Sequence, residues 1–197
     1  MVKNENINIE YEARAMITEE QYFEIMDFFS KVKKEKKYIR NVNTYFDYED
    51  LFLTNHQIVI RTRSIDDKEY ELTLKIKGES GDTEYNLQLS KNEYDKINET
   101  AQILKGNIKD KLLENKVDLS KLKRITTLST IRLEVYYKKY TLVIDKNEYD
   151  DKTDYNVEVE SYSKTAAKMH LNKSFSRFGV SYKKGYISKS RRAIFKI

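Results

Sequence analysis

Residues 7–16, with the sequence Ile-Asn-Ile-Glu-Tyr-Glu-Ala-Arg-Ala-Met, alternate polar and apolar side chains. A period of two is typical of a β-strand whose two faces differ in character. One face carries Glu10, Glu12 and Arg14, and the other carries apolar residues such as Ile9 and Ala13. This stretch therefore predicts a sheet with ionised side chains gathered on one side.

Seven further segments alternate in the same way, and most are joined by short turns rich in Asp, Asn and Gly. Short links between consecutive strands favour antiparallel pairing, because parallel strands need a longer crossover. The eight expected strands are residues 7–16, 44–54, 57–65, 70–77, 84–89, 126–136, 140–146 and 155–162.

Amphipathic helices are expected between the strands. Thr18 with Gln21, and Ser90 with Glu93, form capping-box patterns, and apolar residues follow each of them at helical spacing. Two more helices are expected at residues 108–114 and from about 164 to 178. Since no linker, repeat or low-complexity segment divides the chain, residues 1–197 predict one α+β domain.

The polar faces of the expected strands group side chains of like charge. For any single strand, a solvated outer face is the simpler alternative. However, like charges that lie side by side repel each other, and several strands share this pattern. The pairs are Arg61 with Arg63, Lys75 with Lys77, and Glu158 with Glu160.

Eight strands are enough to close a barrel whose interior admits one small ligand. If the charged faces line that interior, helices must cover the apolar faces outside. This arrangement accounts for the amphipathic helices and for a hydrophobic content of 39% that includes 16 Tyr. The predicted fold is an eight-stranded antiparallel β-barrel with a charged interior, flanked by amphipathic helices.

Charges inside a barrel are costly unless a ligand neutralises them. The basic set needs a polyanion, and the acidic set needs a hard cation such as Mg²⁺, which shares its oxygen ligands between carboxylates and phosphates. A linear triphosphate with its metal satisfies both. The basic set is Arg14, Arg61, Arg63, Lys75, Lys77 and Arg132, and the acidic set is Glu10, Glu12, Asp145, Glu158 and Glu160.

Composition excludes several other functions. The absence of Cys rules out disulfides, thiolate catalysis and cysteine zinc sites. The five Gly residues lack the spacing of a Walker or dinucleotide-binding loop, and His56 and His170 have no neighbouring triad pattern. Without a long apolar run or a signal peptide, we expect a cytoplasmic protein with no membrane partner.

The charged motifs resemble, in order, those of the CYTH or triphosphate tunnel metalloenzyme family. The segment from Glu10 to Arg14, Glu-Tyr-Glu-Ala-Arg, is similar to the family's ExExK motif. The resemblance extends over about residues 8–193. Its further parts are residues 44–47, 60–63, 74–78, Glu84, Arg132, Asp145, residues 157–160, and Lys189 with Arg192.

This resemblance implies a tunnel in which triphosphates react with Mg²⁺ or Mn²⁺. Under it, Glu10, Glu12 and Arg14 are the catalytic residues. The metal ligands are Glu10, Glu12, Asp145, Glu158 and Glu160. The phosphate-binding residues are Arg61, Arg63, Lys75, Lys77, Arg132, Lys189 and Arg192, and the last two, Lys189 and Arg192, lie at the mouth of the tunnel.

Arg14 stands where the family usually has Lys. Arginine stays protonated, so it cannot act as a base. Proton transfer then depends on a carboxylate, or the protein binds phosphate with weakened catalysis.

Three functions remain open. The preferred one is a metal-dependent triphosphatase acting on a small molecule, namely tripolyphosphate, a nucleoside triphosphate or thiamine triphosphate. An adenylyl cyclase on the same scaffold would instead release pyrophosphate and a cyclic nucleotide. A non-catalytic binding protein would show no turnover. Its ligand would be polyphosphate or the 5′-triphosphate end of an RNA, and no other nucleic-acid partner is expected. The sequence leaves the oligomeric state open.

Overall fold

The computed structural model describes residues 5–78, 82–103 and 106–197, without the side chains of residues 5 and 8–10. Within these ranges the mixed α+β class is confirmed. In chain order the elements are β1 (Glu5–Ile17), α1 (Glu19–Lys31), β2 (Lys36–Asp47), α2 (Phe52–Asn55), β3 (Ile58–Ile65), β4 (Glu69–Ile76), β5 (Asp82–Leu89), α3 (Lys91–Thr100), α4 (Asn107–Glu114), η1 (Leu119–Lys121), β6 (Lys123–Tyr137), β7 (Tyr140–Tyr149), β8 (Lys152–Ser161), α5 (Lys164–Phe175), η2 (Ser176–Phe178) and α6 (Lys189–Phe195).

The chain forms two compact units. Unit 1 comprises Met1–Ile9, Asn41–Leu128 and Lys189–Ile197, and unit 2 comprises Glu10–Arg40 and Ser129–Ser188. The boundaries at residues 9/10, 40/41 and 128/129 fall inside β1, β2 and β6. Three strands therefore begin in one unit and end in the other.

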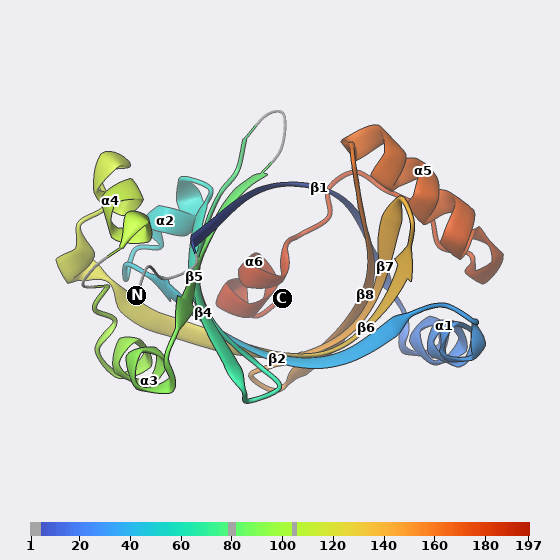
Figure 1. Ribbon diagram of the computed structural model, residues 1–197, viewed down its shortest axis with the longest axis horizontal. Coiled ribbons are helices and arrows are strands. Elements are labelled where there is room, and N and C mark those ends of the chain that lie inside the picture. Colours follow the sequence, from blue (N-terminus) through green and yellow to red (C-terminus); the bar gives the residue numbers. More distant parts are fainter. Residues whose placement is uncertain (1–4, 79–81, 104–105) are drawn as a thin grey trace. The chain divides into compact units, whose positions relative to one another are not determined.

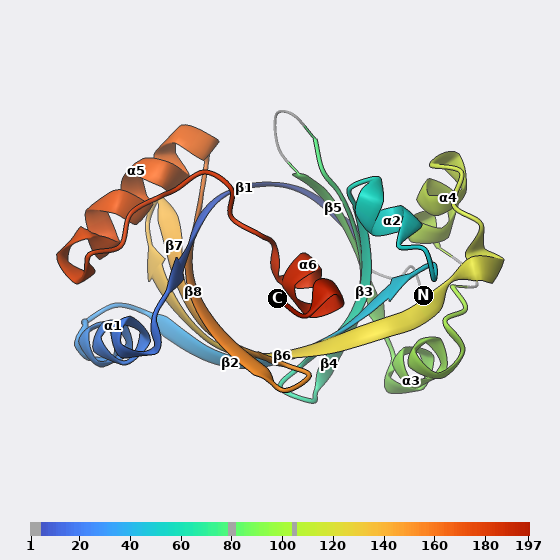
Figure 2. The same cartoon turned by 180° about the vertical axis from the view of Figure 1, so that it is seen from behind.

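Unit 1 contains an antiparallel sheet in which β3 pairs with β2 and β4, and β4 pairs with β5. Its apolar face buries Ile60, Leu72 and Leu74. Helices α2, α3 and α4 cover this face, and they can be followed beside β3 and β5 in Figures 1 and 2. Ile108 and Leu112 of α4 join the same core. Burial of this face stabilises the unit by the hydrophobic effect.

Unit 2 contains a second antiparallel sheet, in which β7 pairs with β6 and β8, and β8 pairs with β1. Its apolar face buries Leu133, Ile144 and Val157 against helices α1 and α5 (Figure 1). The rings of Phe29 of α1 and Phe175 of α5 pack together there, with their centroids 5.6 Å apart. The expected helical cover of the apolar faces is thus present in each unit.

The helix starts follow the sequence signals closely. Both expected capping boxes form, with Thr18 and Gln21 at α1 and with Ser90 and Glu93 at α3. Each pair satisfies backbone donors that a helix otherwise leaves unbonded. No helix in the described part of the chain is long and apolar enough to span a membrane.

The strand expected at residues 44–54 is wrong at both ends, because β2 spans Lys36–Asp47. The buried carboxylate of Asp47 accepts hydrogen bonds from the backbone N–H groups of Tyr48, Leu53 and Thr54, at 2.7, 2.8 and 2.9 Å. These bonds turn the chain away from the sheet and hold the start of α2. The earlier part of β2 is mostly polar, so it lacks the regular polar–apolar alternation that predicts a strand.

Three other elements, β7, β8 and α6, differ from expectation. β7 continues beyond its expected end to Tyr149, and β8 begins earlier than expected, at Lys152. A tight turn in which Asp150 has φ +53° joins the two strands. The sequence also gave no signal for α6, a short helix that carries Lys189 and Arg192. Its basic first turn lacks the acidic residues that usually mark a helix start.

Candidate functional site

In each unit the sheet face opposite the apolar core carries charged side chains that are largely buried. Asp145 is 0% exposed and Glu158 is 2% exposed in unit 2, while Glu84 is 5% exposed in unit 1. A face open to solvent would leave such side chains mostly exposed. The alternative of solvated outer faces therefore fails for these residues.

Arg132 is the central cation of unit 2. Its Nε donates to Asp145 Oδ1 at 2.9 Å and its Nη2 to Asp145 Oδ2 at 3.0 Å, a bidentate pair, and Nη2 also lies 3.2 Å from Glu158 Oε2. Burial opposes the charge on Arg132, but the carboxylates of Asp145 and Glu158 more than offset burial and hold its pKa well above its ordinary value. Arg132 is therefore fixed in position and in charge.

Arg14 bridges β1 and β8. Its Nε donates to Glu158 Oε1 at 3.1 Å, its Nη2 forms an ion pair with Glu12, and its guanidinium lies 5.6 Å from the centre of the Tyr186 ring. This position is the one at which the sequence departs from the family motif. Because two carboxylates neutralise Arg14, it acts as an internal counter-ion of the acidic face.

A chain of buried amides, which the sequence analysis missed, supports the two carboxylates. Asn156 Nδ2 donates to both Asp145 Oδ2 and Glu158 Oε1, at 3.3 Å each. Asn156 in turn accepts a bond of 2.8 Å from Asn147, whose Nδ2 also donates to Asp154 at 2.9 Å. The direction of these bonds presents the donor end of Asn156 to the carboxylates. The sequence did contain a signal for them. Asn147 lies two residues after Asp145 in β7, and Asn156 lies two residues from both Asp154 and Glu158 in β8, so each amide shares a strand face with acidic residues.

Further polar groups complete this network. Thr130 Oγ1 donates to Asn147 Oδ1 at 2.9 Å, and Tyr149 Oη donates to Asp154 Oδ2 at 2.7 Å. Both hydrogens and the carbonyl of the Asn147 amide are thus used. A buried network in which each member is bonded holds its side chains in one arrangement.

Acidic side chains outnumber arginines on the polar face of unit 2, here called the acidic face, among the side chains that the structure describes. Glu12 lies directly opposite Glu160 in the β1–β8 register, a pairing of like charges that costs free energy. Among the described side chains, this face carries the carboxylates of Glu12, Glu134, Asp145, Asp154, Glu158 and Glu160 and the guanidinium groups of Arg14 and Arg132.

An all-oxygen set with surplus negative charge fits a hard divalent cation in its chemistry. Among the side chains that the structure describes, no group of three acidic or histidine residues already lies in a metal-binding arrangement. The expected ligand Glu10 belongs to β1 by its backbone, and its side chain lies outside the described residues.

The polar face of unit 1 carries the basic residues. Arg61 Nη2 lies 3.3 Å from Glu84 Oε1, and Lys75 Nζ lies 3.5 Å from Glu84 Oε2. Arg63 Nη1 lies 3.2 Å from Glu71, and Arg63 Nε donates to Asn43 Oδ1 at 2.9 Å. The structure thus brings Arg61, Lys75 and Glu84 together on this face.

The remaining expected phosphate ligands are placed less uniformly. Lys77 follows the end of β4 and is exposed, while Lys189 is half-buried at the start of α6. Arg192 is 4% exposed on the same helix. A guanidinium buried to this degree is a cation held inside the protein rather than a surface charge.

The order of these motifs and the pairing of their strands define a family. The CYTH domain profile matches residues 8–186, and the chain belongs to the CYTH domain family. The chain is 27% identical over 174 residues to "Putative triphosphatase YjbK" of Bacillus subtilis, a match that covers 87% of each protein.

Solved structures agree with this assignment. The crystal structure of a "putative adenylate cyclase" from Bacillus halodurans has a TM-score of 0.83 and 28% sequence identity, and the match covers 94% of this chain and 97% of the other. A Hippeastrum protein, described as a "putative adenylyl cyclase" with a dominant triphosphatase activity, has a TM-score of 0.79 and 18% identity over 93% of this chain and 94% of the other. The second likeness shows the fold alone.

Proposed function

We propose that this chain is a divalent-metal-dependent triphosphatase, whose substrate is tripolyphosphate, a nucleoside triphosphate or thiamine triphosphate. Under this proposal residues 1–197 form one domain, whose eight strands close into a tunnel, and the charged sheet faces bind this substrate.

One observation carries the proposal: the buried charges differ in kind between the units. Unit 1 offers Arg61, Arg63 and Lys75, while unit 2 has surplus carboxylates fixed by hydrogen bonds. A triphosphate with its metal carries both the anionic and the cationic groups that these faces need. Membership of the CYTH family and the name of the Bacillus subtilis relative support the same activity.

Residues of this chain have distinct parts in the hydrolysis. The cations of unit 1 bind the phosphate oxygens and neutralise charge that would repel a nucleophile. A water oxygen bonds to the terminal phosphorus as the bridging P–O bond breaks, and the bond's electron pair leaves with the shortened phosphate chain. Since Arg14 stays protonated, a carboxylate such as Glu12 orients this water and accepts its proton.

Glu12, Glu158 and Glu160, with Glu10 and Asp145, are the residues that would hold the metal, Mg²⁺ or Mn²⁺. When bound, such an ion withdraws negative charge from phosphate oxygens. Arg14 and Arg132 reduce the repulsion among these carboxylates, since each contacts Glu158. Arg132 is also a proposed ligand of the phosphate oxygens.

The test is product analysis on a panel of tripolyphosphate, ATP, GTP and thiamine triphosphate, with Mg²⁺, with Mn²⁺ and with a chelator. We expect metal-dependent release of orthophosphate that the chelator abolishes. Pyrophosphate together with a cyclic nucleotide from ATP would establish the cyclase instead. Saturable binding of these compounds without any turnover would establish a binding protein and overturn the proposal.

A further inference from the structure

A pocket of about 340 Å³ lies in unit 2 beside the end of β1. Arg14 and Met16 form part of one wall, and the segment of residues 179–186 forms another. Its volume falls in the range of pockets that hold small ligands. Among the expected site residues whose side chains the structure describes, Arg14 alone lines it, so the pocket adjoins the acidic face without being part of it.

The lining of this pocket is cationic. Arg14, Lys183 and Lys184 line it, and none of the described lining residues is acidic. Glu12 and Glu158 neutralise Arg14 from the β1–β8 side. The uncompensated charge therefore comes from Lys183 and Lys184, which are exposed and can turn toward an anion.

The rim of the pocket leaves its backbone accessible. Gly185 adopts φ +88°, and a Cβ added there would meet no atom within 4 Å. Gly179 adopts φ +72°, and its added Cβ would meet only Gln21 Nε2 nearby, at 3.8 Å. Backbone of this kind lets a ligand approach closely without a side chain in the way.

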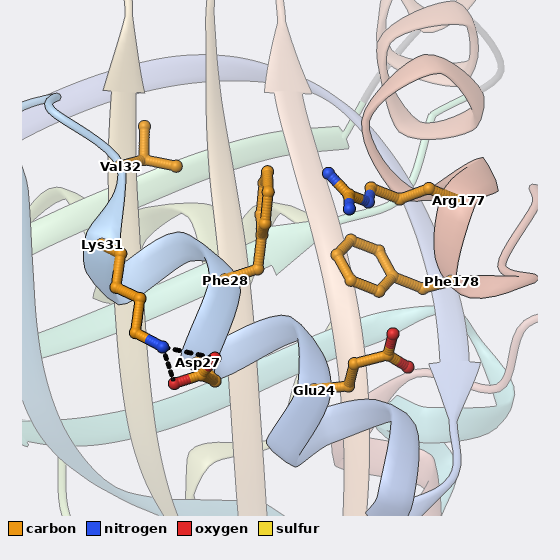
Figure 3. A pocket seen from close by; sticks show the side chains of 7 residues that line it. All are labelled: Glu24, Asp27, Phe28, Lys31, Val32, Arg177 and Phe178. Carbon is orange, nitrogen blue, oxygen red and sulfur yellow. Dashed lines mark hydrogen bonds and ion pairs between the residues drawn. The ribbon is translucent and has the colours of Figure 1, made fainter.

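A second pocket, of about 470 Å³ and lined by residues of α1 and η2, gives a useful contrast (Figure 3). Its Lys31 is bound to Asp27, and its Arg177 lies over the Phe28 ring at 4.3 Å. Glu24 adds another acid, so the charges of this lining balance. Nothing in that pocket selects a ligand by charge.

We propose that the pocket lined by Lys183 and Lys184 binds a phosphoryl group, as a site additional to the cations of unit 1. Two sources supply this chemistry: free orthophosphate, and the end of a polyphosphate chain longer than three units. Binding of orthophosphate does not depend on the proposed function, whereas use of the pocket by a longer substrate rests on it.

The direct test is titration of the full-length, metal-free protein with inorganic phosphate, followed by backbone amide NMR. We expect saturable shifts at Gly179, Ser181 and Gly185. The double variant Lys183→Ala/Lys184→Ala should bind phosphate about tenfold more weakly. The matched control is Lys138→Ala/Lys139→Ala, which removes the same charge from the turn between β6 and β7 and should bind like the unmodified protein.

Absence of saturable shifts at these amides, or equal affinity in the two double variants, would overturn the proposal. A second comparison identifies the source. If the pocket holds a chain end, loss of both lysines weakens binding of tetrapolyphosphate more than tripolyphosphate. If it holds free phosphate, both chains bind unchanged and only inhibition by orthophosphate weakens. Phosphate binding that persists in a protein without turnover would refute the proposed function and leave this site standing.

Discussion

The charged faces of the two units differ in how firmly their side chains are held. In unit 2, Arg132 binds Asp145 through two hydrogen bonds of 2.9 and 3.0 Å, and the buried amide of Asn156 donates to the carboxylates of Asp145 and Glu158. In unit 1, Glu84 is shared between Arg61 at 3.3 Å and Lys75 at 3.5 Å. The acidic face is thus more tightly organised than the basic face.

This difference suggests a division of labour. Fixed groups aimed at a reacting centre lower the barrier because they need no rearrangement during the reaction. Longer contacts made by Arg and Lys can be exchanged for phosphate oxygens when a substrate binds. Changes in unit 2 should therefore reduce kcat and metal dependence, and changes in unit 1 should chiefly raise KM.

The largest effect is expected from Glu158→Gln, which keeps the shape of the side chain and removes its charge. We expect kcat to fall by about 1,000-fold, because a preorganised charge is lost at the centre of the acidic face. Phosphate release at saturating substrate measures this. Glu148→Gln, at an exposed position on β7, is the matched control. If the two variants have equal rates, the acidic face of unit 2 is not the catalytic centre.

A smaller effect is expected from Asn156→Asp, which replaces a donor by a carboxylate beside Asp145 and Glu158. The added charge repels both acids, so we expect kcat to fall by about 10- to 100-fold and the acid limb of the pH–rate profile to move to higher pH. Asn86→Asp makes the same exchange on the polar face of unit 1, where Asn86 bonds to Thr73. That control should leave the acid limb in place; equal movement in both variants would remove the distinction between the faces.

A third effect concerns substrate binding. Arg61→Ala should raise KM about tenfold with little change in kcat, because one charged contact to phosphate is lost. Steady-state kinetics across a range of substrate concentrations separates the two constants. Arg124→Ala, which removes an exposed arginine of the same unit, should change neither. A fall in kcat at constant KM would place Arg61 with the catalytic groups instead.

The smallest effect concerns stability in the helical layer of unit 2. Burial, with Lys173 and Lys139 nearby, lowers the pKa of His170 below its ordinary value of 6.5, and its ring stacks on Tyr140. Just below pH 6.5 the unfolded chain binds more protons at this position than the folded one, so the free energy of unfolding decreases as the pH falls.

His170→Gln should therefore flatten the fall in melting temperature between pH 7 and about pH 5.5, as thermal unfolding would show. His56→Gln, at an exposed position in unit 1, is the control. An unchanged slope for His170→Gln would show that other groups determine the acid sensitivity.

Much of each sheet was predictable because alternation reports which face a residue occupies. Arg61 and Arg63 share a face in β3, and Glu158 and Glu160 share one in β8, each opposite an apolar core. The capping boxes of α1 and α3 were equally visible, since they depend on two residues three positions apart. The pairing of Glu12 with Glu160 needed the register, which no single segment contains.

The missed features depend on contacts between distant parts of the chain. The sequence pattern places Asp47 within a strand motif, whereas in the structure Asp47 is the last residue of β2 and its carboxylate accepts hydrogen bonds from three backbone N–H groups beyond the strand. Asn147 and Asn156 are unremarkable in a sequence, because an amide shows its role only when its partners are known. A search for charges alone therefore passed over the groups that position them.

The interleaving of the two units inside β1, β2 and β6 bears on any attempt to divide the molecule. Each unit is assembled from non-contiguous stretches, three for one and two for the other. No single cut in the chain can separate either unit as one continuous fragment. Limited proteolysis should accordingly yield nicked species that stay associated or collapse together, and recovery of one folded half by itself would contradict this expectation.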